Sequence, residues 1–592
     1  MKKLDPVFIP MLVFPLAMLL FFLLAPLAMV LEASRHYDIL SMFSDPFMIH
    51  IPSLSYILQN FVFIGHVGNY TVIRITGVSF GTILNSVLTA CATTIGATLL
   101  GTLIAFVIAR YEFPGRAILR ALSMVPLLMT PFINAYVIKK IFDWNYGLIS
   151  WFLNSVLNIP IKFGIDSYAG VVLAQIMTFY PIVYLNAYAS LMNIDPSLEE
   201  QAQNLGAKGF RLFRSITLPL ALPGIAAGAA LVFIFSMEDV GAPIIFNCQD
   251  YISYQIVSLF QAAYTGQMSP EAAALALVLL LFSIAIFVCI KKYVSLRRYA
   301  AIVRGARAPK LRKLGPLGLA GVYLGIFPLV LAMAFPQVGV IIYAFCRNWI
   351  TSALPQGFTL AHLAKIVADP IVSRAILNSL AYSLAALGLI VAMGVCASYV
   401  IARSRIPGVD ILDVFVTMPI ALPGLVVAVG YFYFFTTFFK GTPLDPITFG
   451  PALLLVLAYS VRKLPFTARA VYAGLQQLHE ALEEAAMTLG ASRLRVLKDI
   501  VLPLLLLNIV GGALISFVYC VSEVSVSITL GGLGGLGVNH QAPLTYVMYQ
   551  YILGPTGPYI VAALGFFLIV IQLAAIVVSN AVFKQRFAVI GV

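Results

Sequence analysis

Apolar stretches of about 20 residues or more recur along the whole chain, and they constrain its fold more than any other feature. A stretch of that length can cross a bilayer, and it must be helical there because lipid offers the backbone no hydrogen-bond partners. The chain is 61% hydrophobic and only 10% charged, whereas soluble domains carry about 25% charged residues. The sequence therefore predicts an all-α, polytopic membrane protein and argues against a soluble enzyme.

Twelve stretches qualify as spanning helices, six in each half of the chain. The predicted ranges are 7–31, 82–109, 117–142, 167–193, 216–236 and 270–290 in the first half, and 317–346, 376–402, 411–438, 450–475, 500–521 and 557–582 in the second. The first stretch, Val7 to Leu31, is longer than the apolar region of a secretory signal. We therefore expect it to be an uncleaved first helix, with a cleaved signal as the alternative.

Basic residues predict the orientation of the chain, because positive charge accumulates on the cytoplasmic side of membrane proteins. The residues that fall on one side are Lys2, Lys3, Arg110, Arg116, Arg120, Lys208, Arg211, Arg214, Arg403, Arg405, Arg493, Arg495, Lys498, Lys584 and Arg586. We expect a multi-pass protein of the cell membrane with both termini in the cytoplasm.

One 22-residue polar segment occurs twice, at 198–219 and at 482–503, and the two copies are identical at 11 of 22 positions. We call them the first and second repeat segments. Other landmarks repeat as well, among them Asn85 with Asn378. Because each half has an even number of helices, the two copies share one orientation. The sequence predicts a parallel repeat with a first unit at 1–292, a basic cytoplasmic linker at 293–314 and a second unit at 315–592.

The repeat segments have clear local signals. Asp195 and Pro196 suit the N-cap and first position of a short helix, although Ser197 allows a start two residues later. Gly206 and Gly490 permit a bend after that helix. A basic stretch and a Leu-Pro pair then lead into the next spanning helix, where proline is tolerated in the first turn.

The second repeat segment contains Glu-Ala-Ala, three residues, Gly, nine residues, Ile, one residue and Leu-Pro; the first departs from this pattern only at Gln201. This pattern resembles the signature of permease subunits of binding-protein-dependent ABC importers, and the resemblance covers the whole chain as two fused six-helix units. It implies that the segments are coupling helices that contact ATPase subunits. The coupling residues so implied are Glu199, Glu200, Ala202, Gly206, Ile216, Leu218 and Pro219, and Glu483, Glu484, Ala485, Ala486, Gly490, Ile500, Leu502 and Pro503.

The resemblance further implies two ATP-binding cassette ATPase subunits, an extracytoplasmic substrate-binding protein and a small solute as partners, with ferric iron as the leading substrate. The chain has no P-loop pattern of its own, so ATP hydrolysis is expected on a separate subunit. An ion-coupled secondary transporter is the alternative, and an integral-membrane enzyme is a weaker one. We predict no catalytic residues, no cofactor and no metal site.

Two further groups of charged residues have alternative interpretations. The basic linker suits cytoplasmic topology better than a nucleic-acid or anionic-lipid surface, so we expect membrane lipid but no nucleic acid as a partner. Asp239 and Glu523 occupy matching positions after the fifth helix of each half. Acids at membrane depth are costly and usually face a pathway or a partner, so both are pathway candidates, with a solvated helix end as the alternative.

Overall fold

The structure is a computed structural model that describes residues 6–128, 130–262, 269–296, 311–404, 406–534, 540–552, 554 and 557–583. Most of the predicted linker and the basic residues near both ends of the chain lie outside these ranges. The described residues are mainly helical, and the all-α class predicted from the sequence is confirmed.

The elements of the first half are α1 (Phe8–Leu19), η1 (Leu20–Leu24), α2 (Ala25–Ser34), α3 (Ile39–Met42), α4 (Leu54–Asn60), β1 (Val62–Val67), β2 (Tyr70–Ile75), α5 (Thr82–Arg110), β3 (Tyr111–Glu112), α6 (Arg116–Leu122), η2 (Val125–Leu128), α7 (Pro131–Ile141), α8 (Leu148–Trp151), η3 (Phe152–Val156), β4 (Ile161–Ile165), α9 (Ser167–Met192), α10 (Pro196–Asn204), α11 (Gly209–Leu212), η4 (Phe213–Thr217), α12 (Leu218–Glu238), α13 (Gly241–Ile245), α14 (Ile252–Ala262) and α15 (Pro270–Leu296).

Those that follow are β5 (Arg312–Lys313), α16 (Pro316–Gly321), η6 (Val322–Ile326), α17 (Phe327–Phe345), β6 (Cys346–Asn348), β7 (Gln356–Phe358), α18 (Ala361–Ala368), α19 (Pro370–Arg403), α20 (Val409–Thr417), η7 (Met418–Ala421), α21 (Gly424–Phe438), α22 (Ala452–Gln477), α23 (Glu480–Thr488), α24 (Arg493–Val496), η8 (Leu497–Val501), α25 (Leu502–Val521), α26 (Ser525–Leu530), α27 (Leu544–Ile552) and α28 (Gly557–Phe583).

Within the described ranges, nine continuous helical runs are long and apolar enough to cross a membrane, and two bent pairs bring the number to eleven. The nine runs are Phe8–Ser34, Thr82–Arg110, Ser167–Met192, Gly209–Glu238, Pro270–Cys289, Pro316–Phe345, Pro370–Arg403, Arg493–Val521 and Gly557–Ala575. The one predicted stretch that is not among these eleven, 450–475, corresponds to the helix α22. This helix carries Arg462, Lys463 and Arg469 and is therefore less apolar than the others.

The third predicted span of each half, 117–142 or 411–438, is not one straight helix but a pair of helices joined by a sharp bend. The two helices of each pair are bent by 107° in the first half and by 106° in the second. Thr130 and Leu422 are extended at the breaks, with ψ of 135° and 123°. Each precedes a proline, Pro131 or Pro423, and proline disfavours the helical conformation of the residue before it.

The first helices of the two halves exchange places. The run α1–α2 packs on α19 and α21 of the second half, where the Tyr431 hydroxyl donates a hydrogen bond of 2.7 Å to the Phe22 carbonyl oxygen. In the other direction α17 packs on α7, and the Gln337 amide donates to Asn134 Oδ1 at 2.9 Å. The two sequence repeats are therefore not two separately packed bodies.

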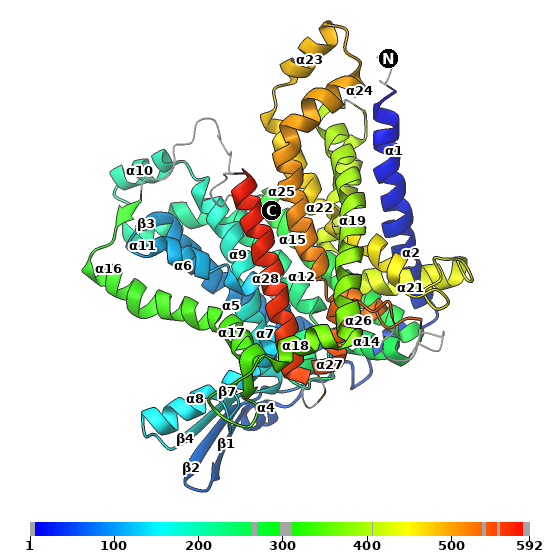
Figure 1. Ribbon diagram of the computed structural model, residues 1–592. Helices are drawn as coiled ribbons and strands as arrows, with labels where there is room; N and C mark the ends of the chain where they lie inside the picture. Colours follow the sequence, from blue (N-terminus) through cyan, green and yellow to red (C-terminus); the bar gives the residue numbers. More distant parts are fainter. Residues whose placement is uncertain are drawn as a thin grey trace.

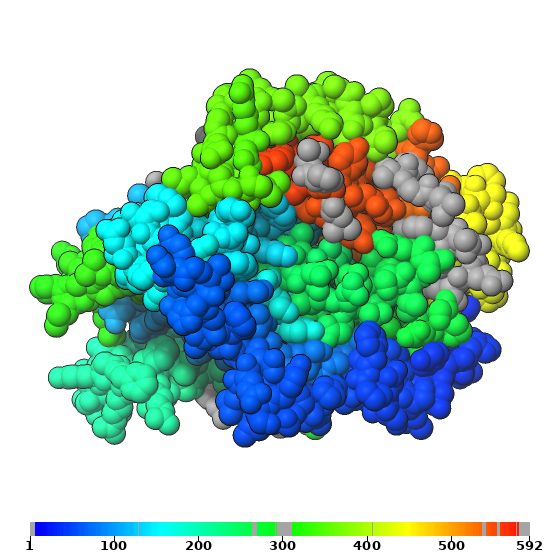
Figure 2. Space-filling view, turned by 90° about the horizontal axis from the view of Figure 1, so that it is seen from below, coloured from blue at the N-terminus to red at the C-terminus, as the bar shows by residue number. Residues whose placement is uncertain are grey.

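The two ends of the molecule differ in structure. The short helices α10 and α23 project at one end, whereas the hairpin β1–β2 extends from the other (Figure 1). Strand β2 pairs antiparallel with β1 and parallel with β4 in a three-stranded sheet. Seen from the end that carries this sheet, residues of the first half, in blue to green, meet residues of the second half, in light green to red (Figure 2).

Candidate functional site: two repeat segments and a buried charge network

Each repeat segment folds into a short helix, a glycine bend and a second helix that continues into the membrane-spanning region. The first has α10, then Gly206 at φ 88°, then the run Gly209–Glu238. The second has α23, then Gly490 at φ 90°, then the run Arg493–Val521. A Cβ added at either glycine would meet nothing within 4 Å, so the left-handed backbone, and not a lack of space, favours glycine there.

Each Leu-Pro pair begins the next spanning helix, α12 or α25, as the sequence predicted. That helix continues without a break from the preceding turns of the runs Gly209–Glu238 and Arg493–Val521. A π-helical turn precedes each pair, η4 in the first repeat segment and η8 in the second. Proline has no N–H to donate to the preceding turn, and the wider π-turn accommodates that missing bond. The residues placed in these turns or directly after them are Ile216, Leu218 and Pro219, and Ile500, Leu502 and Pro503.

One glutamate of each segment points inward and is held by an arginine. Glu199 Oε1 lies 2.9 Å from the guanidinium of Arg110 and accepts a hydrogen bond of 2.7 Å from Thr217. Glu483 Oε1 accepts a hydrogen bond of 2.7 Å from Arg403 Nε. Both pairs are buried, and both arginines end the long second helix of their half. The two pairs therefore fasten α10 and α23 to the permease core.

The outer face of each segment carries matched exposed residues. Glu200 and Glu484 are exposed, as is Ala485. Leu205 and Leu489, one residue before the glycine bends, are 90% and 89% exposed. One exposed leucine would need no explanation, but the same exposure at matching positions of both repeat segments makes them candidates for contact with another protein.

A backbone hydrogen bond to a half-buried alanine stabilises each glycine bend. The carbonyl oxygen of Ala202 accepts a hydrogen bond from the Ala207 amide at 2.9 Å. Ala486 accepts one from the Ala491 amide at 3.1 Å. These bonds satisfy carbonyl groups that a helix end otherwise leaves without partners.

A network of four charged side chains joins the two halves in the interior. Arg462 lies 2.5 Å from Glu523 and 3.4 Å from Glu238, which belongs to the first half. Lys463 Nζ lies 2.6 Å from the other oxygen of Glu523. Glu238 also accepts a hydrogen bond from the amide of Gly424, at the start of α21. Buried charges are tolerated when they are paired. The carboxylates of Glu238 and Glu523 therefore both depend on Arg462, which they share.

Asp239 occupies the matching position in the first half but has a neutral environment. Its carboxylate accepts hydrogen bonds from Gln175 Nε2 at 3.0 Å and from the Gly241 amide at 2.9 Å. Asp239 and Glu523 are 7% and 5% exposed, so neither lies on a solvated helix end. The two matching acids therefore differ in the charge of their partners. Asp239 is bound by the neutral amide of Gln175, whereas Glu523 is bound by Arg462 and Lys463.

The basic partners of the buried glutamates were not identified from the sequence; they are Arg110 for Glu199, Arg403 for Glu483, and Arg462 with Lys463 for Glu523. Arg110 and Arg403 counted only as topology signals, although they are 293 positions apart, the same spacing as Asn85 and Asn378. That shared spacing could have marked them as functionally paired with the repeat segments. The basic pair at 462–463 also carried a signal, since ionisable residues inside an otherwise apolar helix usually have a specific partner.

The duplicated helical units, the matched segments at one end and the charged network between the halves define a multi-pass membrane component of a transport system. The family model described as binding-protein-dependent transport system inner membrane component matches residues 97–297 and again residues 386–586. Because the two matches together cover more than half of the chain, the chain belongs to this family. The fused, duplicated permease that the sequence resembles is confirmed.

Among similar proteins, a chain from Haemophilus influenzae named as a ferric transport system permease protein is 28% identical over 413 residues. That match covers 69% of this chain and 63% of the relative, so the chain spans less than two thirds of that protein's length. A ferric transport system permease protein of Actinobacillus pleuropneumoniae is 26% identical over 512 residues, 85% of this chain and 72% of the relative. The molybdenum transport system permease protein of Haemophilus influenzae is 34% identical over 185 residues, 31% of this chain and 78% of that relative.

Proposed function

We propose that this chain is the complete solute pathway of an ATP-driven importer, with two ATPase subunits docked on its two repeat segments. The observation that carries the proposal is the matched exposure of Leu205 and Leu489, which directly follow α10 and α23. These two short helices project at one end of the molecule (Figure 1). Each leucine projects from a short helix that a buried Glu–Arg pair fastens to the core. A push on either short helix would therefore be passed directly to the long second helix of that half.

The orientation follows from the positions of the basic residues. We propose that the end with α10 and α23 is cytoplasmic, together with both termini, because basic residues concentrate there. An extracytoplasmic substrate-binding protein would then dock at the opposite end, where β1 exposes Phe63 and Ile64 at 53% and 67%. We also propose that the chain divides into a first unit at 1–292, a cytoplasmic linker at 293–314 and a second unit at 315–592.

The charge network would form the closed part of the pathway. Glu238 and Arg462 come from different halves, so separation of the halves must break their contact. ATP-driven movement of the two repeat segments would supply the work for this step. Asp239 and Glu523 would then line the opened path, where Asp239 has neutral hydrogen-bond donors and Glu523 keeps its contacts with Arg462 and Lys463.

The proposed substrate is ferric iron. Its support is the similarity to relatives named for ferric transport, which extends over most of this chain, whereas the molybdenum relative matches about one unit. Carboxylates are hard oxygen donors that suit such a cation during passage. Among the described residues no group of three or more acidic, histidine or cysteine side chains forms a metal-holding cluster.

The test is ATP-driven uptake by the reconstituted chain together with its ATPase and its substrate-binding protein. Single cysteines at Leu205 and Leu489, in a chain without other cysteines, should each crosslink to an ATPase subunit. Uptake of ferric iron should require ATP and should exceed uptake of molybdate. Uptake driven by a proton or sodium gradient without ATP would instead establish a secondary transporter, and preferred uptake of molybdate would overturn the substrate.

A further inference from the structure

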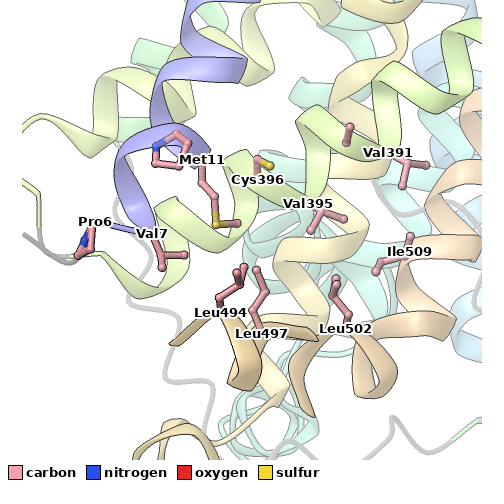
Figure 3. Close-up of a pocket in the computed structure, with 12 residues that line it drawn as sticks. Pro6, Val7, Met11, Val391, Val395, Cys396, Leu494, Leu497, Leu502 and Ile509 are labelled. Carbon is pink, nitrogen blue, oxygen red and sulfur yellow. The ribbon is translucent and has the colours of Figure 1, made fainter. Parts of the chain in front are cut away.

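An apolar cavity of about 620 Å³ lies between α1, α19 and the helical run that leads into α25. Its wall is formed by Val391, Val395, Leu494, Leu497, Leu502 and Ile509, and α1 adds Met11 and its neighbours (Figure 3). None of the lining side chains is charged or carries a hydroxyl group. The cavity therefore suits only an apolar occupant.

The cavity has the dimensions and position of a lipid site. Leu494 and Ile509 are 15 residues apart, which is about 22 Å at 1.5 Å per residue. One leaflet contributes about 15 Å to the hydrocarbon core, so the lining is long enough to accompany an acyl chain through one leaflet. The helices that form it belong to candidate membrane spans and carry exposed apolar residues such as Leu494, which is 60% exposed.

Basic residues of the second repeat segment adjoin the lining residues Leu494 and Leu497 in the sequence. Arg495 and Lys498 are exposed, and Lys498 follows Leu494 by four residues and so shares its face of the helix. The guanidinium of Arg493 lies over the Phe8 ring of α1 at 4.8 Å. Asp499 is the single acid in this stretch, so the net charge remains positive.

We propose that this cavity binds one anionic phospholipid. Its acyl chain lies along Val395, Leu497 and Ile509, and its phosphate lies beside Arg495 and Lys498. A membrane supplies this ligand at high local concentration, and each basic side chain near the surface contributes about 1 kcal/mol toward an anionic lipid. Charge complementarity at the rim therefore selects the headgroup, while the apolar wall holds the chain.

The lining residues differ at the matching positions of the first half, which supplies an internal control. The repeat partner of Val395 is Thr102, and the partner of Leu497 is Phe213. The Phe213 ring packs on Phe106 with centroids 4.6 Å apart, so an aromatic pair stands at the position that matches Leu497. One retained lipid is therefore expected for each chain, not two.

The test uses the full-length chain in nanodiscs of phosphatidylcholine, with or without roughly one-fifth phosphatidylglycerol, followed by native mass spectrometry of retained lipids. The wild type should retain one phosphatidylglycerol in preference to phosphatidylcholine. The variant Arg495→Gln/Lys498→Gln should lose that preference by about fivefold for each charge removed, from about 1 kcal/mol each. Ala392→Phe, which places a ring in the cavity, should abolish retention of either lipid.

The matched controls are Arg211→Gln, the repeat partner of Arg495, and Leu99→Phe, the partner of Ala392. Both controls should retain the lipid as the wild type does. Equal retention of the two lipids by the wild type would overturn the proposal, as would an equal loss in the controls. If Ala392→Phe does not fold, the charge variant carries the test alone, because its two substitutions lie on the exposed surface.

Discussion

Arg403 should control whether the second repeat segment stays attached to the core. Its guanidinium donates to Glu483 at 2.7 Å and to the carbonyl oxygens of Leu475 and Leu478 at 3.0 and 2.8 Å. The Arg403 and Glu483 side chains are only 8% and 4% exposed. Arg403→Met keeps much of the apolar stem but leaves Glu483 buried without the arginine, while the Tyr399 hydroxyl still donates a hydrogen bond to it. Removing one member of a buried ion pair costs about 3–5 kcal/mol.

The assay is hydrogen–deuterium exchange of the detergent-solubilised chain, read on peptides that cover α23. If the cost appears as local opening, exchange there should accelerate by about two orders of magnitude or more, because 1.4 kcal/mol corresponds to a factor of ten. The double variant Arg403→Met/Glu483→Leu should recover most of the protection, since no unpaired charge remains. The exposed Arg495→Met is the control. Acceleration below about threefold, or strictly additive effects of the two single changes, would refute the argument.

Three further predictions concern other parts of the site. Gly490→Ala should destabilise the bend by about 1–2 kcal/mol because of its left-handed backbone and should lower ATP-driven uptake, whereas Gly388→Ala, in an open helical position, should not; equal uptake by both variants would contradict this. Glu200→Lys and Glu484→Lys should each weaken ATPase crosslinking at their own segment and reduce uptake well below half, without a change in thermal unfolding, because both side chains are exposed; normal uptake would show that the segments are not equivalent couplers. Arg462→Met should lower the thermal unfolding midpoint, since about 3–5 kcal/mol is lost when Glu238 and Glu523 lose their shared partner; an unchanged midpoint would show that the network does not hold the halves together.

The sequence alone was sufficient for the features that depend on local physics. Apolar length predicted where the helices run, because a bilayer accepts a backbone only when its hydrogen bonds are internal. The bends at Gly206 and Gly490 and the N-cap at Asp195 were also predictable, because the conformational range of glycine and the capping geometry of aspartate involve only neighbouring residues. The breaks before Pro131 and Pro423 had an equally local cause, although the apolar pattern concealed them.

Only the tertiary structure decided which of these elements meet. The exchange of α1 and α17 between halves, the Arg403–Glu483 pair across 80 positions and the Arg462–Glu238 contact across 224 positions join residues that no local pattern relates. A lone sequence shows that a buried charge needs a partner but not which one, because the energy of pairing depends on distance and burial in the folded chain. For that reason the sequence revealed Glu523 as a candidate, while the fold supplied Arg462 and Lys463 as the groups that hold it.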